Sequence, residues 1–202
     1  MRAAHLDDVG HLHTIGGGGR RRRAIWSRIR AWPGIARRRG EGRAVIDGFR
    51  FTSRWRADAT AAQVWRVLSD AATWPRWWPG VVGATVVRAG DGDHVGERTL
   101  LTVRAPTGYR LRFGVELTEV TPGVLARARV VGDLVGSGVW SLRDDGAGVV
   151  METVWQVHPR RRWMRLVAPL AGRWFARAHA AVMASGQRGL RSALAGVHSE
   201  CR

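Results

Sequence analysis

The sequence predicts an α+β domain in which a seven-stranded antiparallel sheet is covered by a long helix near the C-terminus. Between residues 49 and 159, apolar and polar residues alternate in short runs that turn sequences separate. After residue 161, the apolar residues recur instead at the three- and four-residue spacing of a helix. A sheet with one apolar face needs a cover, which such a helix supplies.

The first strand is expected at residues 49–56, where the residues divide between two faces. Arginine and threonine occupy one face, which we expect to contact water. The other face carries Phe49, Phe51, Ser53 and Trp55.

Two short helices are expected to follow this strand. Thr60 and Gln63 form a capping-box pair, which predicts a helix that ends near Ser69. Asp70 is then expected to cap a second short helix through DAATWPRWW. In this second helix Trp77 and Trp78 are adjacent, so we expect at most one of them to face the core.

Six further strands are expected before Pro159. The connections between them are short and rich in glycine, proline and aspartate, which favours an antiparallel meander. The predicted strands are residues 83–89, 96–105, 109–120, 124–131, 135–143 and 149–158.

The covering helix is expected from Arg161 to about Gly196. Pro169 and several glycines should weaken or kink it, so two helices are an alternative to one. The glycines are Gly172, Gly186 and Gly189, and the apolar stripe is formed by Val167, Leu170, Trp174, Ala178, Val182, Leu190 and Leu194.

Residues 1–43 are expected to be a disordered arginine- and glycine-rich tail, and residues 44–198 the folded domain. The tail holds 11 arginines against 3 acidic residues. As an alternative, Trp26, Ile29 and Trp32 recur at helical spacing and would form a short cationic helix that touches anionic lipid or RNA. Methionine is absent between residues 2 and 150, so a start at a non-Met codon near Val45 is also open.

The net charge of +17 does not by itself indicate a nucleic-acid partner. All 33 basic residues are arginine, a bias typical of GC-rich coding sequence. Arginine clusters at residues 160–165 and at Arg110 and Arg112 could steer an acidic ligand or make weak contact with an anionic membrane. Solvated faces of a helix and a strand explain them equally well, and nucleic acid is not expected as a partner.

The sequence predicts a cytoplasmic protein without a metal or other cofactor. No run of 18 apolar residues, secretory signal, phosphate-binding loop, dinucleotide-binding motif, nucleophile elbow or HExxH helix is found. The single cysteine, Cys201, can form no disulfide within the chain. His11 and His13 are close in sequence, but their placement is taken as incidental.

Five short motifs give the chain a family resemblance. They are VW at residues 64–65, SD at 69–70, WPRWWP at 74–79, GDLVGSGVW at 132–140 and HAAVMASGQRGLRSAL at 179–194. In this order, residues 47–196 resemble the SRPBCC superfamily and, within it, the START-like and polyketide cyclase/dehydrase group. The resemblance implies a helix-grip fold, with the sheet curled around the C-terminal helix, an apolar cavity between them and two short helices closing one end.

An apolar cavity favours binding of a small hydrophobic or amphipathic molecule, such as a polyketide, a lipid or a quinone-like compound. The alternative is an aromatase/cyclase or dehydratase that uses Tyr109 and His179 for proton transfer. His179 could instead bond a backbone carbonyl, and the inward faces show no complete catalytic set. A second alternative is a membrane-surface or RNA-associated protein that works through the basic tail, and the oligomeric state is left open. The residues expected to bind the ligand are Phe51, Trp55, Trp65, Trp77, Trp78, Tyr109, Leu111, Phe113, Val115, Trp140, Met151, Thr153, Trp155, Trp174, His179 and Met183.

Overall fold

The computed structural model describes residues 48–106, 108–160 and 162–199. The expectations for the basic tail, including its short amphipathic helix and its histidines, concern residues outside this part of the chain. The same holds for Cys201.

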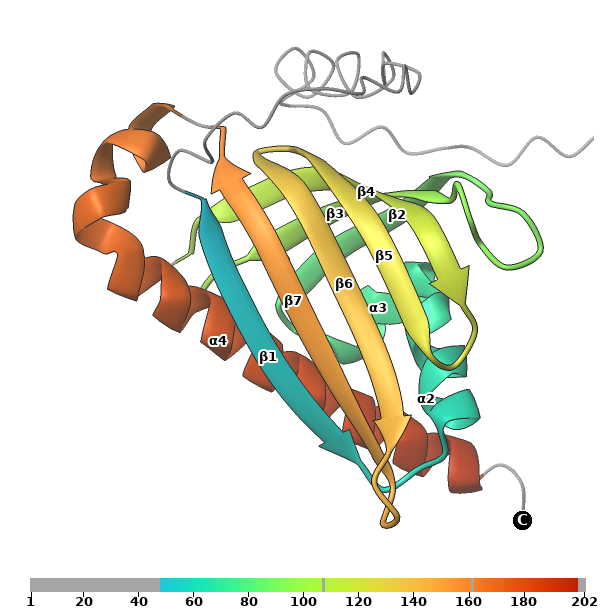
Figure 1. Cartoon of the computed structure of the whole chain (residues 1–202). Helices are drawn as coiled ribbons and strands as arrows, with labels where there is room; N and C mark the ends of the chain where they lie inside the picture. The colour runs from blue at the N-terminus through green and yellow to red at the C-terminus, as the bar shows by residue number, and fades with distance from the viewer. Residues whose placement is uncertain (1–47, 107, 161, 200–202) are drawn as a thin grey trace, which may run out of the picture. The chain divides into compact units, whose positions relative to one another are not determined.

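Seven antiparallel strands form one curved sheet, as predicted (Figure 1). Its spatial order is β1-β7-β6-β5-β4-β3-β2, so the first strand pairs with the last. Phe49 lies opposite Val157 and Trp55 lies opposite Met151 in this pairing. The strands are β1 (Phe49–Ala57), β2 (Val81–Arg88), β3 (Arg98–Arg104), β4 (Arg110–Thr121), β5 (Leu125–Gly132), β6 (Leu134–Asp144) and β7 (Val149–Pro159).

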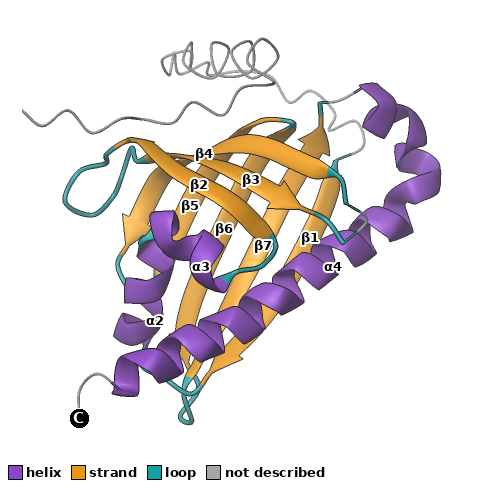
Figure 2. Cartoon of the chain, turned by 180° about the vertical axis from the view of Figure 1, so that it is seen from behind, coloured by secondary structure: helices purple, strands orange, loops and turns teal. Residues whose placement is uncertain are grey.

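The covering helix α4 (Arg162–Ser199) is one continuous helix, so the alternative of two helices is wrong. Figure 2 shows that it runs along the concave side of the sheet, with its first turns set at an angle to the rest. This arrangement is the helix-grip fold that the family resemblance implies. Among the described residues, no helix combines the length and the apolar character that a membrane crossing requires.

Two glycines of α4 allow close approach of another helix rather than kinking α4. A Cβ atom at Gly186 would overlap the indole of Trp78 and lie 2.7 Å from the Trp55 ring. A Cβ atom at Gly189 would overlap the carbonyl oxygen of Trp77. Only glycine leaves room at this surface for residues 74–78, called here the tryptophan-rich segment.

The predicted capping box begins α2 (Ala61–Ser69), with hydrogen bonds between Thr60 and Gln63 in both directions. The second predicted helix is instead a 3-10 turn, η1 (Ala71–Thr73), followed by the short helix α3 (Trp74–Trp77). The side chain of Asp70 makes no capping bond there, whereas the backbone carbonyl oxygen of Asp70 accepts from the Thr73 hydroxyl at 2.8 Å.

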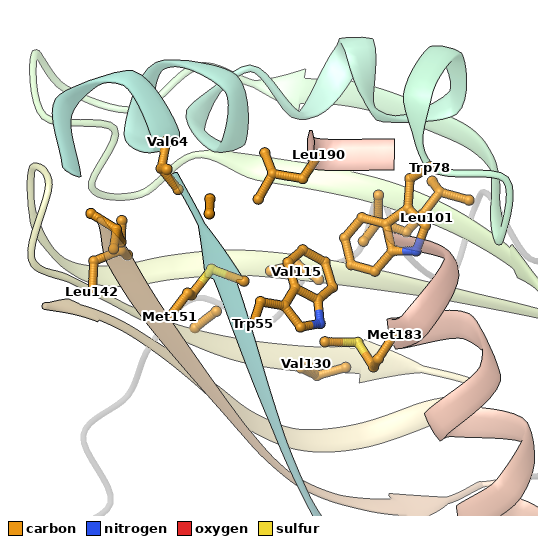
Figure 3. Close-up of a cluster of buried hydrophobic side chains, with 14 of the residues drawn as sticks. Trp55, Val64, Trp78, Leu101, Val115, Val130, Leu142, Met151, Met183 and Leu190 are labelled. Carbon is orange, nitrogen blue, oxygen red and sulfur yellow. The ribbon is translucent and has the colours of Figure 1, made fainter. Parts of the chain in front are cut away.

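The hydrophobic core lies between α2, α4 and the concave face of the sheet (Figure 3). Val64 of α2 and Leu190 of α4 are almost fully buried within it. The sheet contributes Trp55, Val115, Val130 and Met151, whose positions follow the alternation seen in the sequence. Several core residues, among them Phe113, Met151 and Met183, also line cavities between the sheet and the helices.

Candidate functional site

A cavity, called here the main cavity, lies between the concave face of the sheet and α4. Its volume is about 120 Å³. The side chains around it are almost all aliphatic or aromatic, because each strand turns its apolar face inward. The lining residues are Phe49, Phe51, Trp74, Trp78, Val81, Leu101, Val103, Ala105, Tyr109, Leu111, Phe113, Leu134, Trp140, Trp155, Val157, Pro159, Phe175, Ala178, His179, Val182 and Met183.

A second cavity of about 70 Å³, called here the second chamber, lies under α2 and α3. Trp74, Trp78, Leu101 and Trp140 line both cavities and form the partition between them. The other residues of the second chamber are Trp65, Leu68, Ser69, Ala71, His94, Glu97, Thr99, Val115, Leu117, Ala126, Leu142 and Met151.

His179 brings a polar group from α4 into the wall of the main cavity. Its ring stacks on Phe51 with 4.5 Å between ring centroids, and its Nε2 atom is 3.3 Å from the Ser53 hydroxyl. This bond goes to a side chain and not to a backbone carbonyl, contrary to one of the expectations. Burial lowers the pKa of His179 to about 4. The imidazole is therefore neutral at pH 7 and suits hydrogen bonding better than proton uptake.

Tyr109 brings the other polar group to the main cavity, from the start of β4. Its ring stacks on Trp174 of α4 with centroids 5.2 Å apart. Burial raises the pKa of the phenol, so the hydroxyl keeps its proton at neutral pH. A neutral phenol can donate a hydrogen bond to a ligand oxygen.

The second chamber holds a polar cluster that was not predicted from the sequence. Glu97 Oε2 is 2.9 Å from Nδ1 of His94, and the Thr99 hydroxyl donates to Glu97 Oε1 at 3.1 Å. The carboxylate is buried, with 8% of the residue exposed. Within the described parts of the chain, no three His, Cys, Asp or Glu side chains are grouped so that they could hold a metal ion.

The tryptophan-rich segment closes the end of the main cavity near α3. Trp78 is buried, and its ring packs on Trp74 and Trp55 at centroid distances of 5.5 and 5.1 Å. Trp77 is only partly buried and stacks on Trp78 at 5.6 Å. As expected, one of the two adjacent tryptophans faces the core, while the other lines neither cavity.

Most residues expected to bind a ligand line one of the two cavities, and four do not. Trp55 is buried in the core against Trp78, and Thr153 is fully buried between its paired neighbours Ser53 and Trp140. The other two are Trp77 and Trp174, of which Trp174 is 37% exposed. Phe51, Trp78, Tyr109, Leu111, Phe113, Trp140, Trp155, His179 and Met183 line the main cavity, and Trp65, Trp78, Val115, Trp140 and Met151 line the second chamber.

Two kinds of lining residue were not predicted from the sequence. Leu101, Val103 and Ala105 alternate along β3 and its end, a signal that would have placed them on the inner face. His94 and Glu97 belong to the loop before β3, where no periodicity indicates the direction of a side chain.

Comparison with known families agrees with this architecture. Residues 48–194 match the family described as polyketide cyclase / dehydrase and lipid transport. The chain belongs to this family, and through it to the SRPBCC superfamily. No curated protein is similar enough in sequence to match.

Members of this superfamily with solved structures share the fold at low sequence identity. A START superfamily protein from Mycobacterium smegmatis is 12% identical, with a TM-score of 0.61 over 75% of this chain and 99% of that one. The Zhui aromatase/cyclase from Streptomyces sp. R1128 is 14% identical, with a TM-score of 0.59 over 73% of this chain and 94% of that one. The di-domain aromatase/cyclase StfQ of the steffimycin pathway is 15% identical, with a TM-score of 0.58 over 76% of this chain and 52% of that one.

Proposed function

We propose that this protein binds a small hydrophobic or amphipathic molecule, such as a polyketide, a lipid or a quinone-like compound, in the main cavity. The observation that carries the proposal is the lining of that cavity. Among the lining residues that the structure describes, only Tyr109 and His179 contribute side-chain polar atoms other than indole nitrogens. Both are neutral at pH 7, so no charge opposes entry of an apolar ligand.

Burial of the ligand's own apolar surface would supply most of the affinity, at about 25 cal/mol per Å². An apolar cavity of about 150 Å³ can hold a benzene-sized molecule. The main cavity, at about 120 Å³, therefore suits one ring or a short chain as it stands. A larger ligand would extend into the second chamber by displacing Trp140 or Trp74 from the partition.

A second candidate function is chemical change of the bound molecule, as in an aromatase/cyclase or dehydratase. The low pKa of His179 makes it a weak base at neutral pH, which disfavours the predicted role for this residue. The paired His94 and Glu97 favour this second function, because they bring acid–base chemistry to the second chamber.

We further infer a cytoplasmic location and at most weak contact with anionic membranes. The basic side chains of β1 alternate with the residues that face the cavity, and Arg50, Arg54 and Arg56 are exposed on the outer face. An exposed arginine near an anionic surface contributes about 1 kcal/mol, so a few of them would give only weak attraction.

The proposal is tested by measuring how a ligand changes the thermal stability of purified protein. With 2-methoxynaphthalene and oleic acid as probes, we expect a rise in Tm for the wild type, because binding only to the folded state stabilises it. Phe113→Asp and Leu111→Asp each place a charge in the cavity wall and should abolish the rise. Leu111 is the less buried of the two, which makes Leu111→Asp the variant better able to fold.

Val124→Asp is the matched control, because Val124 is 53% exposed and lines neither cavity. Equal rises in Tm for the wild type and for folded Leu111→Asp would contradict the cavity assignment. Native mass spectrometry of protein purified from its own host would identify any ligand that survives purification.

A further inference from the structure

We propose that His94 and Glu97 form a proton-accepting subsite in the second chamber. In this subsite, His94 takes the proton of an acidic hydroxyl group, phenolic or enolic, on an aromatic ligand. Glu97 is a positioning residue that acts through His94. The inference rests on the proposed function, because the ligand must first enter the space between sheet and helix.

The hydrogen bond between the two side chains fixes the tautomer of His94. A carboxylate can only accept, so the contact of 2.9 Å between Glu97 Oε2 and Nδ1 of His94 requires the proton on Nδ1. In the neutral imidazole, Nε2 then carries a free lone pair. The Thr99 hydroxyl donates to the other carboxylate oxygen and so holds Glu97 in place.

The loop between β2 and β3 is built to hold His94 in one orientation. His94 has a φ of 69°, the left-handed region that residues other than glycine rarely adopt. The carboxylate of Asp91 accepts from the backbone amides of Asp93 at 3.0 Å and Val95 at 2.8 Å, which closes the loop around His94. A Cβ atom at Gly90 would lie 2.7 Å from Cα of His94, so the loop is tightly closed. Local strain of this kind persists where the surrounding structure imposes it, and it is common at functional sites.

The surroundings of His94 suit the hydroxyl-bearing edge of an aromatic ligand that extends into the second chamber from the main cavity. Trp65 and Leu68 of α2, Trp74 of α3 and Trp140 of β6 line the same chamber. Among its described lining residues, only His94 and Glu97 ionise. The elements packed around the chamber bring no further charge to it, and Asp91 and Asp93 lie in the loop itself.

The proposed step moves one proton. The O–H bond of the ligand breaks, its electron pair stays on oxygen, and the proton binds Nε2 of His94. The product is a phenolate or enolate beside an imidazolium, and the negative charge of Glu97 stabilises that imidazolium. No oxidant or further reactant is needed. An ionised oxygen raises the reactivity of the neighbouring ring carbons, which links this subsite to chemical change of the ligand.

The test follows the ionisation of 2-naphthol bound to the full chain, by its absorption change, against pH. We expect wild-type protein to lower the apparent pKa of bound 2-naphthol by at least about one pH unit relative to His94→Asn, a tenfold change in the ionisation constant. Asparagine tolerates the left-handed backbone, so this variant keeps the loop. Asp93→Asn, in the same exposed loop, is the control and should behave as the wild type.

The variant Glu97→Gln keeps the size of this side chain and removes its negative charge. The glutamine oxygen can still accept from Nδ1, but its neutral amide does not stabilise an imidazolium, so the apparent pKa of bound 2-naphthol should rise. Nitrogen-15 NMR of His94 at high pH should show the Nδ1–H tautomer in the wild type and in Glu97→Gln. The hydrogen bond is then present in both, so a difference in naphthol ionisation comes from the charge of Glu97 and not from a change in structure.

Binding of 2-methoxynaphthalene, which has no ionisable proton, distinguishes the two proposals. If both naphthalenes bind and the apparent pKa of 2-naphthol is the same in wild type and His94→Asn, the proton-accepting subsite is wrong and the binding function stands. If neither naphthalene binds the wild type but oleic acid does, the subsite is wrong and the binding function stands. If none of the three probes binds, both proposals are rejected.

Discussion

The indole nitrogen of Trp78 donates a hydrogen bond of 2.9 Å to the backbone carbonyl oxygen of Val182. This bond joins the end of α3 to the middle of α4, across the end of the main cavity. Trp74 makes a similar bond of 3.0 Å, but to Leu68 of α2. The tryptophan-rich segment is therefore attached to α2 and to α4. It closes one end of the main cavity and forms part of the wall that the two cavities share.

Replacement of Trp78 should measure the strength of this attachment. In Trp78→Phe, loss of the hydrogen bond and of part of the ring should lower the free energy of unfolding by about 2 kcal/mol. Trp77→Phe is the matched control, because Trp77 has a buried indole nitrogen without a hydrogen-bond partner. Urea denaturation should show a loss below about 1 kcal/mol for this control. Equal losses in both variants would argue against a special role for the bond to Val182.

The close contact of α3 with α4 predicts opposite effects of the same substitution at two glycines of α4. Alanine at Gly186 would overlap Trp78 and should destabilise the domain by about 2 kcal/mol, despite its better helix propensity. Alanine at Gly196, where an added Cβ would meet no atom within 4 Å beyond the neighbouring residues and backbone of α4 itself, should stabilise it by about 0.5 kcal/mol. Thermal melts of both variants check the prediction, and a stable Gly186→Ala protein would refute the packing described here.

The partly buried His179 predicts a loss of stability in mild acid. Its pKa is about 4 in the folded protein and about 6.5 when exposed, so the unfolded chain binds the proton more readily. With respect to this group, the free energy of unfolding is highest above pH 6.5. It decreases as the pH falls from 6.5 to 4, by at most about 3 kcal/mol. His179→Gln should remove this part of the pH dependence.

The control for this measurement is Ser53→Ala, which removes the hydrogen bond to His179 but leaves the ring buried. It should keep most of the pH dependence, because burial is the cause of the low pKa. Denaturant titrations at pH 7 and pH 5 give the free energy of unfolding of each protein at each pH. The same difference in wild type and His179→Gln would assign the acid sensitivity to other groups.

Trp140 predicts which ligand sizes the protein accepts, since its ring lies in the partition between the two cavities. Trp140→Ala should join the cavities, at a cost of about 3 kcal/mol in stability. We expect affinity for pyrene to rise relative to naphthalene in this variant, measured by fluorescence titration. Trp174→Ala, at a site that lines neither cavity, should leave that ratio unchanged. If the ratio is also unchanged in Trp140→Ala, the two cavities do not act as neighbours in ligand binding.

The fold could be predicted from the sequence because local patterns define each element. In β4, the inner face formed by Leu111, Phe113, Val115 and Leu117 follows directly from alternation. Because the turns contain only a few residues, consecutive strands lie side by side and pair. The capping box of Thr60 and Gln63 was equally local, and the structure confirms it.

The site could be predicted only in part, because lining a cavity depends on what covers each residue. Trp55 and Phe51 share one face of β1, yet α3 and α4 cover Trp55 while Phe51 reaches the cavity. Sequence spacing contains no information on this difference. The same is true of His94, whose direction is set by a closed loop and a left-handed backbone rather than by a repeat.

The pairing of β1 with β7 determines when the sheet can be completed during synthesis on the ribosome. Phe49 meets its partner Val157 only after more than half of the chain has been made, and α4 follows later still. Contacts between distant segments form slowly, since a long loop must close first. The main cavity therefore cannot form before β7 and α4 have been made, and a ligand of the proposed kind would enter a domain that is already complete.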